Sequence, residues 1–157
     1  MKAGLKLLIG FILVFGFLAI GIETFRIVKL NMDIEKQITI ICDDAIELSM
    51  DDEFRIDHVS IIDRNLCEEL ICHMLMDKFN LDSGLNPKTE SYLAGPLQLI
   101  VFDIEEGQYK ISGDKPIQKT NPHVWIKGSV EIQPMIINFN KNITIKFKVY
   151  SDNERFD

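Results

Sequence analysis

The chain has 157 residues, with 17 basic and 24 acidic side chains and a formal net charge of −7 at pH 7. Residues 1–29 hold four of the bases and one of the acids. Residues 30–157 therefore carry 13 bases and 23 acids, a net of −10. A domain of that sign repels phosphate backbones, which argues against nucleic-acid binding. Its length suits one domain with a buried core.

The first feature along the chain is an uncharged apolar run of sixteen residues, 7–22. As a helix it is roughly 24 Å long, slightly less than the ~30 Å hydrocarbon core of a bilayer. Because Lys6 can snorkel, we expect these residues to cross the membrane and contact its lipid. A cleaved signal peptide is the open alternative, with Lys2 and Lys6 before the run and residues 19–21 as the cleavage site. The helical pattern continues past that site, which favours a retained anchor.

Basic residues lie on both sides of the apolar run, so they indicate its orientation only weakly. Lys2 and Lys6 precede the run, and Arg26 and Lys29 follow it. A short N-terminal tail with a long acidic domain behind the span favours a cytoplasmic N-terminus, because long domains are translocated largely regardless of charge. We expect residues 1–29 to be the anchor and juxtamembrane segment, and residues 30–157 an α+β domain outside the cell membrane.

Two helices are expected in the first half of the chain. Apolar residues spaced by four and three predict that the anchor helix continues as an amphipathic helix to about Met50, before the acids at 51–53. Its stripe is Ile34, Ile38, Ile41, Ala45 and Leu48. A second helix is expected from Ile61 or Arg64 to Phe79, with Ser60 or Asp63 as the N-cap. Its apolar side is Leu66, Leu70, Ile71 and Met74.

After a loop at residues 80–96, the apolar period changes to two. Residues 97–104 are apolar almost throughout, which predicts a strand that is central or covered on both faces. A turn at 105–107 leads to residues 109–111, the expected hairpin partner. Alternating segments at 124–133 and 143–150, joined by residues 138–142, complete a predicted three- to four-stranded antiparallel meander. Its dry face is expected to pack on the stripe of the first helix.

A membrane helix that continues as the spine of a domain and packs on an antiparallel sheet is the architecture of type IV pilin-like proteins. Several short motifs follow the second helix here in order: Asn80-Leu81-Asp82, Leu85, Pro87, Gly95-Pro96, and Pro122 before two alternating strands. This order resembles the small TadE-like proteins of tight-adherence pilus loci over most of the chain. The resemblance implies a pilin-like fold, a minor pilin or pseudopilin role, and pilin-like subunits or a pilus assembly platform as partners.

The chain departs from prepilins at the peptidase site, where Gly precedes the cut and Glu follows five residues later. Gly4 is followed at that distance by Ile9, and Gly10 is followed by Phe15. The acid nearest the span, Glu23, has a leucine five residues before it. Whether the N-terminus is processed therefore stays open.

No motif for catalysis, cofactor binding or metal binding was identified in the sequence. The three cysteines and three histidines form no CxxC or HExxH motif; they are Cys42, Cys67, Cys72, His58, His73 and His123. Cys67 and Cys72 lie about 140° apart on a helix, which is unsuited to joint ligation. We expect no metal, no cofactor and no small-molecule substrate. A disulfide from Cys42 to Cys67 or Cys72 and buried free thiols both remain open.

Other polar features have ordinary explanations. The acids at 51–53 and Asp57 lack EF-hand spacing and are typical of a solvated charge run. Asn142-Ile143-Thr144 is a glycosylation sequon, relevant only in a eukaryotic secretory route. Trp125, on the wet face of its strand, is a candidate for partner contact; the alternative is packing against the second helix or the loop after it.

Three classes of function follow from this architecture. The first is a membrane-anchored pilin-like structural or assembly subunit of a tight-adherence or type IV pilus-like surface apparatus. The alternative is an anchored or signal-peptide-secreted, non-enzymatic binding module. An enzyme is the third and is disfavoured, because no residues of the sequence cluster into a catalytic site.

Overall fold

The structure is a computed structural model that describes residues 2–51, 59–112, 115–136 and 141–152. These ranges form an α+β fold with a long N-terminal helix, a three-stranded antiparallel sheet and a separate two-stranded sheet. The helices and strands are α1 (Lys2–Leu48), α3 (Arg64–Phe79), β1 (Gln98–Glu105), β2 (Gln108–Ser112), β3 (Lys115–Thr120), β4 (His123–Ile132) and β5 (Ile143–Asp152).

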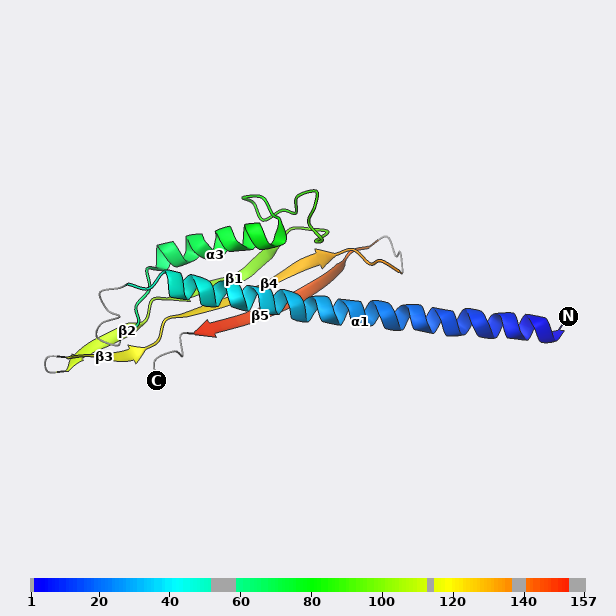
Figure 1. Ribbon diagram of the computed structural model, residues 1–157, viewed down its shortest axis with the longest axis horizontal. Helices are drawn as coiled ribbons and strands as arrows, with labels where there is room; N and C mark the ends of the chain where they lie inside the picture. The colour runs from blue at the N-terminus through cyan, green and yellow to red at the C-terminus, as the bar shows by residue number, and fades with distance from the viewer. Residues whose placement is uncertain (1, 52–58, 113–114, 137–140, 153–157) are drawn as a thin grey trace.

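Helix α1 is continuous over 47 residues, which makes it roughly 70 Å long. Its N-terminal half projects away from the other elements, and its C-terminal half packs against β5 and α3 (Figure 1). The helix ends at Leu48, and Met50 then bridges to Ile62. The predicted continuation of the anchor helix into the domain is confirmed.

The apolar stripe of α1 is buried along most of its predicted length. Ile34, Ile38 and Ala45 are almost fully buried, as expected, and so is Ile41. Leu48 is 61% exposed, so its place in the stripe was wrong. The buried face instead turns toward three other residues near the helix end, because α3 and residues 59–62 cover that side. They are Cys42, Ile46 and Ser49.

Helix α3 begins after Asp63, one of the two predicted caps. The Asp63 carboxylate accepts hydrogen bonds from the backbone N–H groups of Asn65, at 2.9 Å, and Leu66, at 3.1 Å. Asn80 ends the helix in a left-handed conformation with φ 51°. The buried face is the i, i+4 series Cys67, Ile71, Leu75 and Phe79. Leu66 is 41% exposed, contrary to expectation, because it lies one residue off that series.

The main sheet has the order β1-β4-β5, so β4 is the central strand. The alternation predicted for β4 and β5 is confirmed by their buried residues. β1 is an edge strand in which only Ile104 is buried and Ile100 is 61% exposed. The expectation of a central or doubly covered strand was therefore wrong. A register shift between Leu99 and Val101 breaks the alternation and distributes the apolar residues of β1 over both faces.

The segment between β1 and β4 forms its own hairpin. β2 pairs with β3 and not with β1, so the predicted pairing of residues 109–111 was wrong and the sheet is not a simple meander. The hairpin lies at the end of the molecule farthest from the N-terminus of α1 (Figure 1). Gly107, whose φ is 88°, lies at the break between β1 and β2. A Cβ added to it would lie 2.7 Å from the Ser60 carbonyl oxygen and 3.1 Å from Pro122 Cδ.

The core lies between the two helices and one face of the sheet. α1 packs over β5, and α3 lies beside α1 and contacts β1. The predicted match between the helix stripe and the dry face of the sheet is confirmed. The Asp43 side chain also accepts a hydrogen bond from the Ser151 hydroxyl, which links α1 to β5 at the edge of this core.

Candidate functional site

The N-terminal half of α1 is long and apolar enough to cross a membrane. Its large apolar side chains are exposed, for example Phe11 at 59%, Phe15 at 65% and Phe17 at 73%. Gly10 and Gly16 lie in the same half, and nothing lies within 4 Å of a Cβ added to either. An apolar surface of this extent fits a transmembrane or signal-anchor segment.

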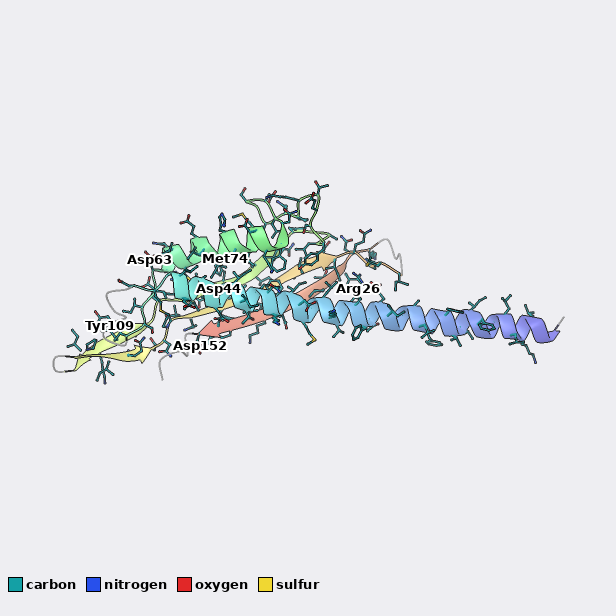
Figure 2. All side chains as sticks on the ribbon, in the orientation of Figure 1. Arg26, Asp44, Asp63, Met74, Tyr109 and Asp152 are labelled. Carbon is teal, nitrogen blue, oxygen red and sulfur yellow. The ribbon has the colours of Figure 1, made fainter. Side chains whose placement is uncertain are left out.

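A charged cluster joins the end of this apolar run to the domain. Glu23, the first residue after the run, is only 4% exposed. Arg26 donates to its carboxylate from Nη2 at 2.7 Å and from the same nitrogen to the Gln133 carbonyl oxygen at 2.8 Å. The backbone N–H groups of Met135 and Ile136 donate to the two Glu23 oxygens at 3.3 and 3.2 Å. Figure 2 shows Arg26 near the end of the sheet that lies closest to the projecting half of α1.

The surroundings of Glu23 favour its charged form. The hydrogen bond from Arg26 lowers the pKa of the Glu23 carboxyl below its ordinary value, and burial opposes this. The two backbone N–H donors, from Met135 and Ile136, lower the pKa further. We call Glu23, Arg26 and residues 133–136 the junction clamp. The sequence signal for it was a lone acid and a base three residues later at the end of an apolar run, which is compatible with an i, i+3 pair but does not reveal the distant loop.

The outer face of the sheet is turned away from both helices, and Trp125 lies on it. Trp125 pairs across the strands with Asp103 and Tyr150, and Lys148 Nζ lies 5.6 Å from its ring centroid. The His123 ring lies 5.3 Å from that of Tyr150. Trp125 is half-buried, and its indole N–H is buried without a hydrogen-bond partner in the described part of the chain.

Lysines surround this aromatic group on the outer face. Lys127, Lys146 and Lys148 are exposed on β4 and β5. The helical side of the domain carries exposed acids, namely Asp33, Asp44, Glu47, Glu68, Glu69 and Asp77. The outer face also carries the acids Asp103, Glu105 and Glu131, so its charges are mixed, whereas exposed acids predominate on the helical side.

The cysteines are free thiols, with Cys42 and Cys67 buried and Cys72 half-buried. Burial raises the pKa of the Cys42 thiol to about 12 and raises that of Cys67 as well. No group of three or more His, Cys, Asp or Glu side chains suited to a metal occurs in the described ranges. The expected charge run at 51–53 and Asp57 falls largely outside those ranges, as does His58.

A shallow hollow lies beside the β2–β3 hairpin. It is lined by Ile61, Glu106, Gly107, Gln108, Tyr109, Lys110 and Lys119. The hollow is largely open to solvent. The junction clamp and the outer sheet face are therefore the two features of the described chain with the most distinctive chemistry.

No family model, characterised protein or solved structure matches this chain. Its function is therefore argued from its own geometry.

Proposed function

We propose that this protein is a membrane-anchored, pilin-like structural subunit of a tight-adherence or type IV pilus-like surface apparatus. Its N-terminus is cytoplasmic and its α+β domain lies outside the cell membrane. The observation that supports this proposal is the continuity of α1, whose exposed apolar half runs directly into the helix at the centre of the domain. No linker separates the apolar half of α1 from the domain, which suits a subunit that packs into a filament or an assembly platform.

The apolar half of α1 supplies one assembly surface. Transmembrane helices associate where small residues allow their backbones to approach closely. Gly10 and Gly16 are such positions, and space around both is open. Helices of neighbouring subunits pack along this half of α1 in the proposed assembly.

The charges of the domain supply a second assembly surface. The outer sheet face has mixed charges, and in the proposed assembly its lysines, Lys127, Lys146 and Lys148, pair with exposed acids on the helical side of the next subunit. A contact between the sheet of one subunit and the helices of the next joins unlike surfaces, and such head-to-tail contacts generate open filaments. Rims of charge at such contacts also fix register.

Assembly can be tested by chemical cross-linking in membranes of the native cells, followed by co-purification of other single-span subunits. Gly10→Leu and Gly16→Leu are expected to lose cross-linked partners, because a bulky side chain separates the helices. Val14→Leu is the matched control, since it alters an exposed bulky position in the same half of α1. Unchanged cross-linking in both glycine variants would contradict assembly through this half of the helix.

A second candidate function is an anchored or secreted binding module. The observation that favours it is the Trp125 indole N–H, which is buried without a partner among the described residues, on a face rich in lysine. Aromatic side chains such as that of Trp125 are enriched at protein interfaces. This candidate expects Trp125→Ala to abolish partner capture by the full chain while Gly10→Leu has no effect; the reverse result favours the pilin-like subunit.

A further inference from the structure

We propose that residues 133–136, in the connection after β4, form a second membrane contact, in which Met135 and Ile136 enter the interfacial region of the bilayer that α1 crosses. This inference rests on the membrane anchoring in the proposed function. It assigns a lipid-binding role to a loop of the domain, far from the anchor in sequence.

The loop lies level with the end of the apolar run of α1. The backbone nitrogens of Met135 and Ile136 lie 3.3 and 3.2 Å from the carboxylate oxygens of Glu23, the residue that follows the apolar run. That run falls roughly 6 Å short of the hydrocarbon core, or about four helical residues. A bilayer that thins by this amount ends its hydrocarbon core at Ile22, which places Glu23 just outside it. The loop lies at this edge.

Apolar side chains are exposed at this level of α1. Met135 is 76% exposed and Ile136 is 46% exposed. Phe25, which is 71% exposed, lies two residues after Glu23 and hence about 200° around the helix from it. Apolar side chains therefore face outward on both sides of α1 where the span ends. Lipid is the partner expected for apolar side chains at this level, because such side chains hold protein segments at the boundary between headgroups and acyl chains.

Backbone groups of the loop form hydrogen bonds with side chains of α1. Backbone polar groups near hydrocarbon must find partners within the protein, whereas groups in water need none. Glu23 accepts from the N–H groups of Met135 and Ile136, and Arg26 donates to the Gln133 carbonyl. Pro134 has no N–H to satisfy. The clamp is also a neutral ion pair, with 2.7 Å between Arg26 Nη2 and Glu23 Oε1, which limits the cost of placing it at a lipid boundary.

A second contact fixes the tilt of the domain on the membrane. A single helix leaves the domain free to lean in any direction, but a loop seated in the interface on one side of α1 selects one direction. The β2–β3 hairpin then lies at the end farthest from the bilayer, since it occupies the opposite end of the molecule (Figure 1). The outer sheet face is held at a defined angle to the membrane.

Depth-dependent fluorescence quenching tests this contact. The full chain is reconstituted into phosphatidylcholine vesicles that contain lipids brominated at known depths, and one tryptophan is added at a time. Met135→Trp reports the loop, Phe15→Trp reports the span, and Ile111→Trp is the control. The exposed fraction of Ile111, 73%, is similar to the 76% of Met135, but Ile111 lies in the β2–β3 hairpin at the far end of the molecule. The parent chain contains a single tryptophan, Trp125, and its fluorescence is subtracted from that of each variant.

We expect Met135→Trp to be quenched at least about twofold more than Ile111→Trp, most strongly by bromines near the headgroups. Phe15→Trp is expected to be quenched most strongly by deep bromines. Quenching of Phe15→Trp without quenching of Met135→Trp would overturn the loop contact and leave the anchor intact. No quenching at either position would overturn the anchor, and with it the proposed function.

The clamp is tested in the same vesicles. Glu23→Gln, combined with Met135→Trp, removes the charge that holds Arg26 and weakens the acceptor for the loop. We expect it to reduce quenching at position 135 by at least about half, because loop residues without fixed partners leave the lipid boundary. The same change combined with Phe15→Trp is expected to leave quenching of the span unaltered. Unchanged quenching at position 135 would show that the clamp does not hold the loop on the membrane.

Discussion

The carboxylate of Glu23 accepts a hydrogen bond from the backbone N–H of Ile136 at 3.2 Å, across 113 positions of the chain. This contact joins the end of the apolar run to the end of the sheet. The domain therefore meets the anchor without an intervening linker, and changes at Glu23 are expected to affect the domain as well as the anchor.

The pH dependence of stability should report Glu23. Because its folded pKa is lowered, Glu23 stabilises the fold above its ordinary pKa of 4.5, and this contribution is lost as the pH falls through the lower folded value. We expect thermal unfolding of the full chain in mild detergent to show a steeper loss of stability below pH 4.5 than unfolding of Glu23→Gln. Asp82, whose pKa is also lowered by backbone N–H donors, chiefly that of Asn86, contributes equally to both proteins. Parallel pH profiles would contradict the clamp as an ionic contact.

Gly107 should tolerate no side chain. Its φ of 88° strains any other residue, and a Cβ would lie 2.7 Å from the carbonyl oxygen of Ser60. Gly107→Ala is expected to lower the free energy of unfolding by about 1–3 kcal/mol. Gly21→Ala is the control, because nothing lies within 4 Å of the added Cβ on that helical residue. Equal stability of the two variants by chemical denaturation would refute the described break between β1 and β2.

Asp63 should stabilise α3 through its cap. Asp63→Ala removes the acceptor for Asn65 and Leu66 and is expected to cost about 1 kcal/mol, whereas Asp63→Asn keeps an acceptor oxygen and costs much less. Urea unfolding of both variants measures the difference. A loss as large in Asp63→Asn as in Asp63→Ala would mean that the side chain does not act as a cap.

The three thiols should differ in reactivity. Cys72 is half-buried, whereas Cys42 is fully buried and has a pKa raised to about 12, so almost none of it is thiolate at pH 8. Alkylation of the native protein followed by peptide mass mapping is expected to modify Cys72 first. Cys42 and Cys67 should react only after unfolding. Modification of Cys42 as fast as that of Cys72 would show that α1 does not bury Cys42 against α3.

Local patterns predicted much of this fold. The 3.6-residue period located both helices, two candidate caps, Ser60 and Asp63, bracketed the start of α3, and strict alternation located β4 and β5. These features depend on neighbours in sequence, so they are visible in it. Leu48 and Leu66 were misplaced because the buried face turns around a helix as its packing partner changes, which depends on tertiary structure.

Pairing between distant segments could not be predicted. β3 was missed for a local reason: it contains Pro116, which argues against a strand, yet a two-stranded ribbon tolerates proline because each of its strands is an edge. The edge position of β1 depends on its partners and on a register shift, not on its composition. The junction clamp is the clearest case, because nothing near Glu23 in sequence indicates that residues 133–136 complete it.

The central claim is that the apolar half of α1 remains attached to the domain as its anchor. The most direct test is the intact mass of the protein extracted from membranes of its own cells. We predict the full-length mass, or the loss of a few leading residues only, with Glu23 and Arg26 still preceded by the apolar run. A mass that corresponds to cleavage near Gly21 would contradict the account, because it would release the domain from the membrane and leave a secreted binding protein.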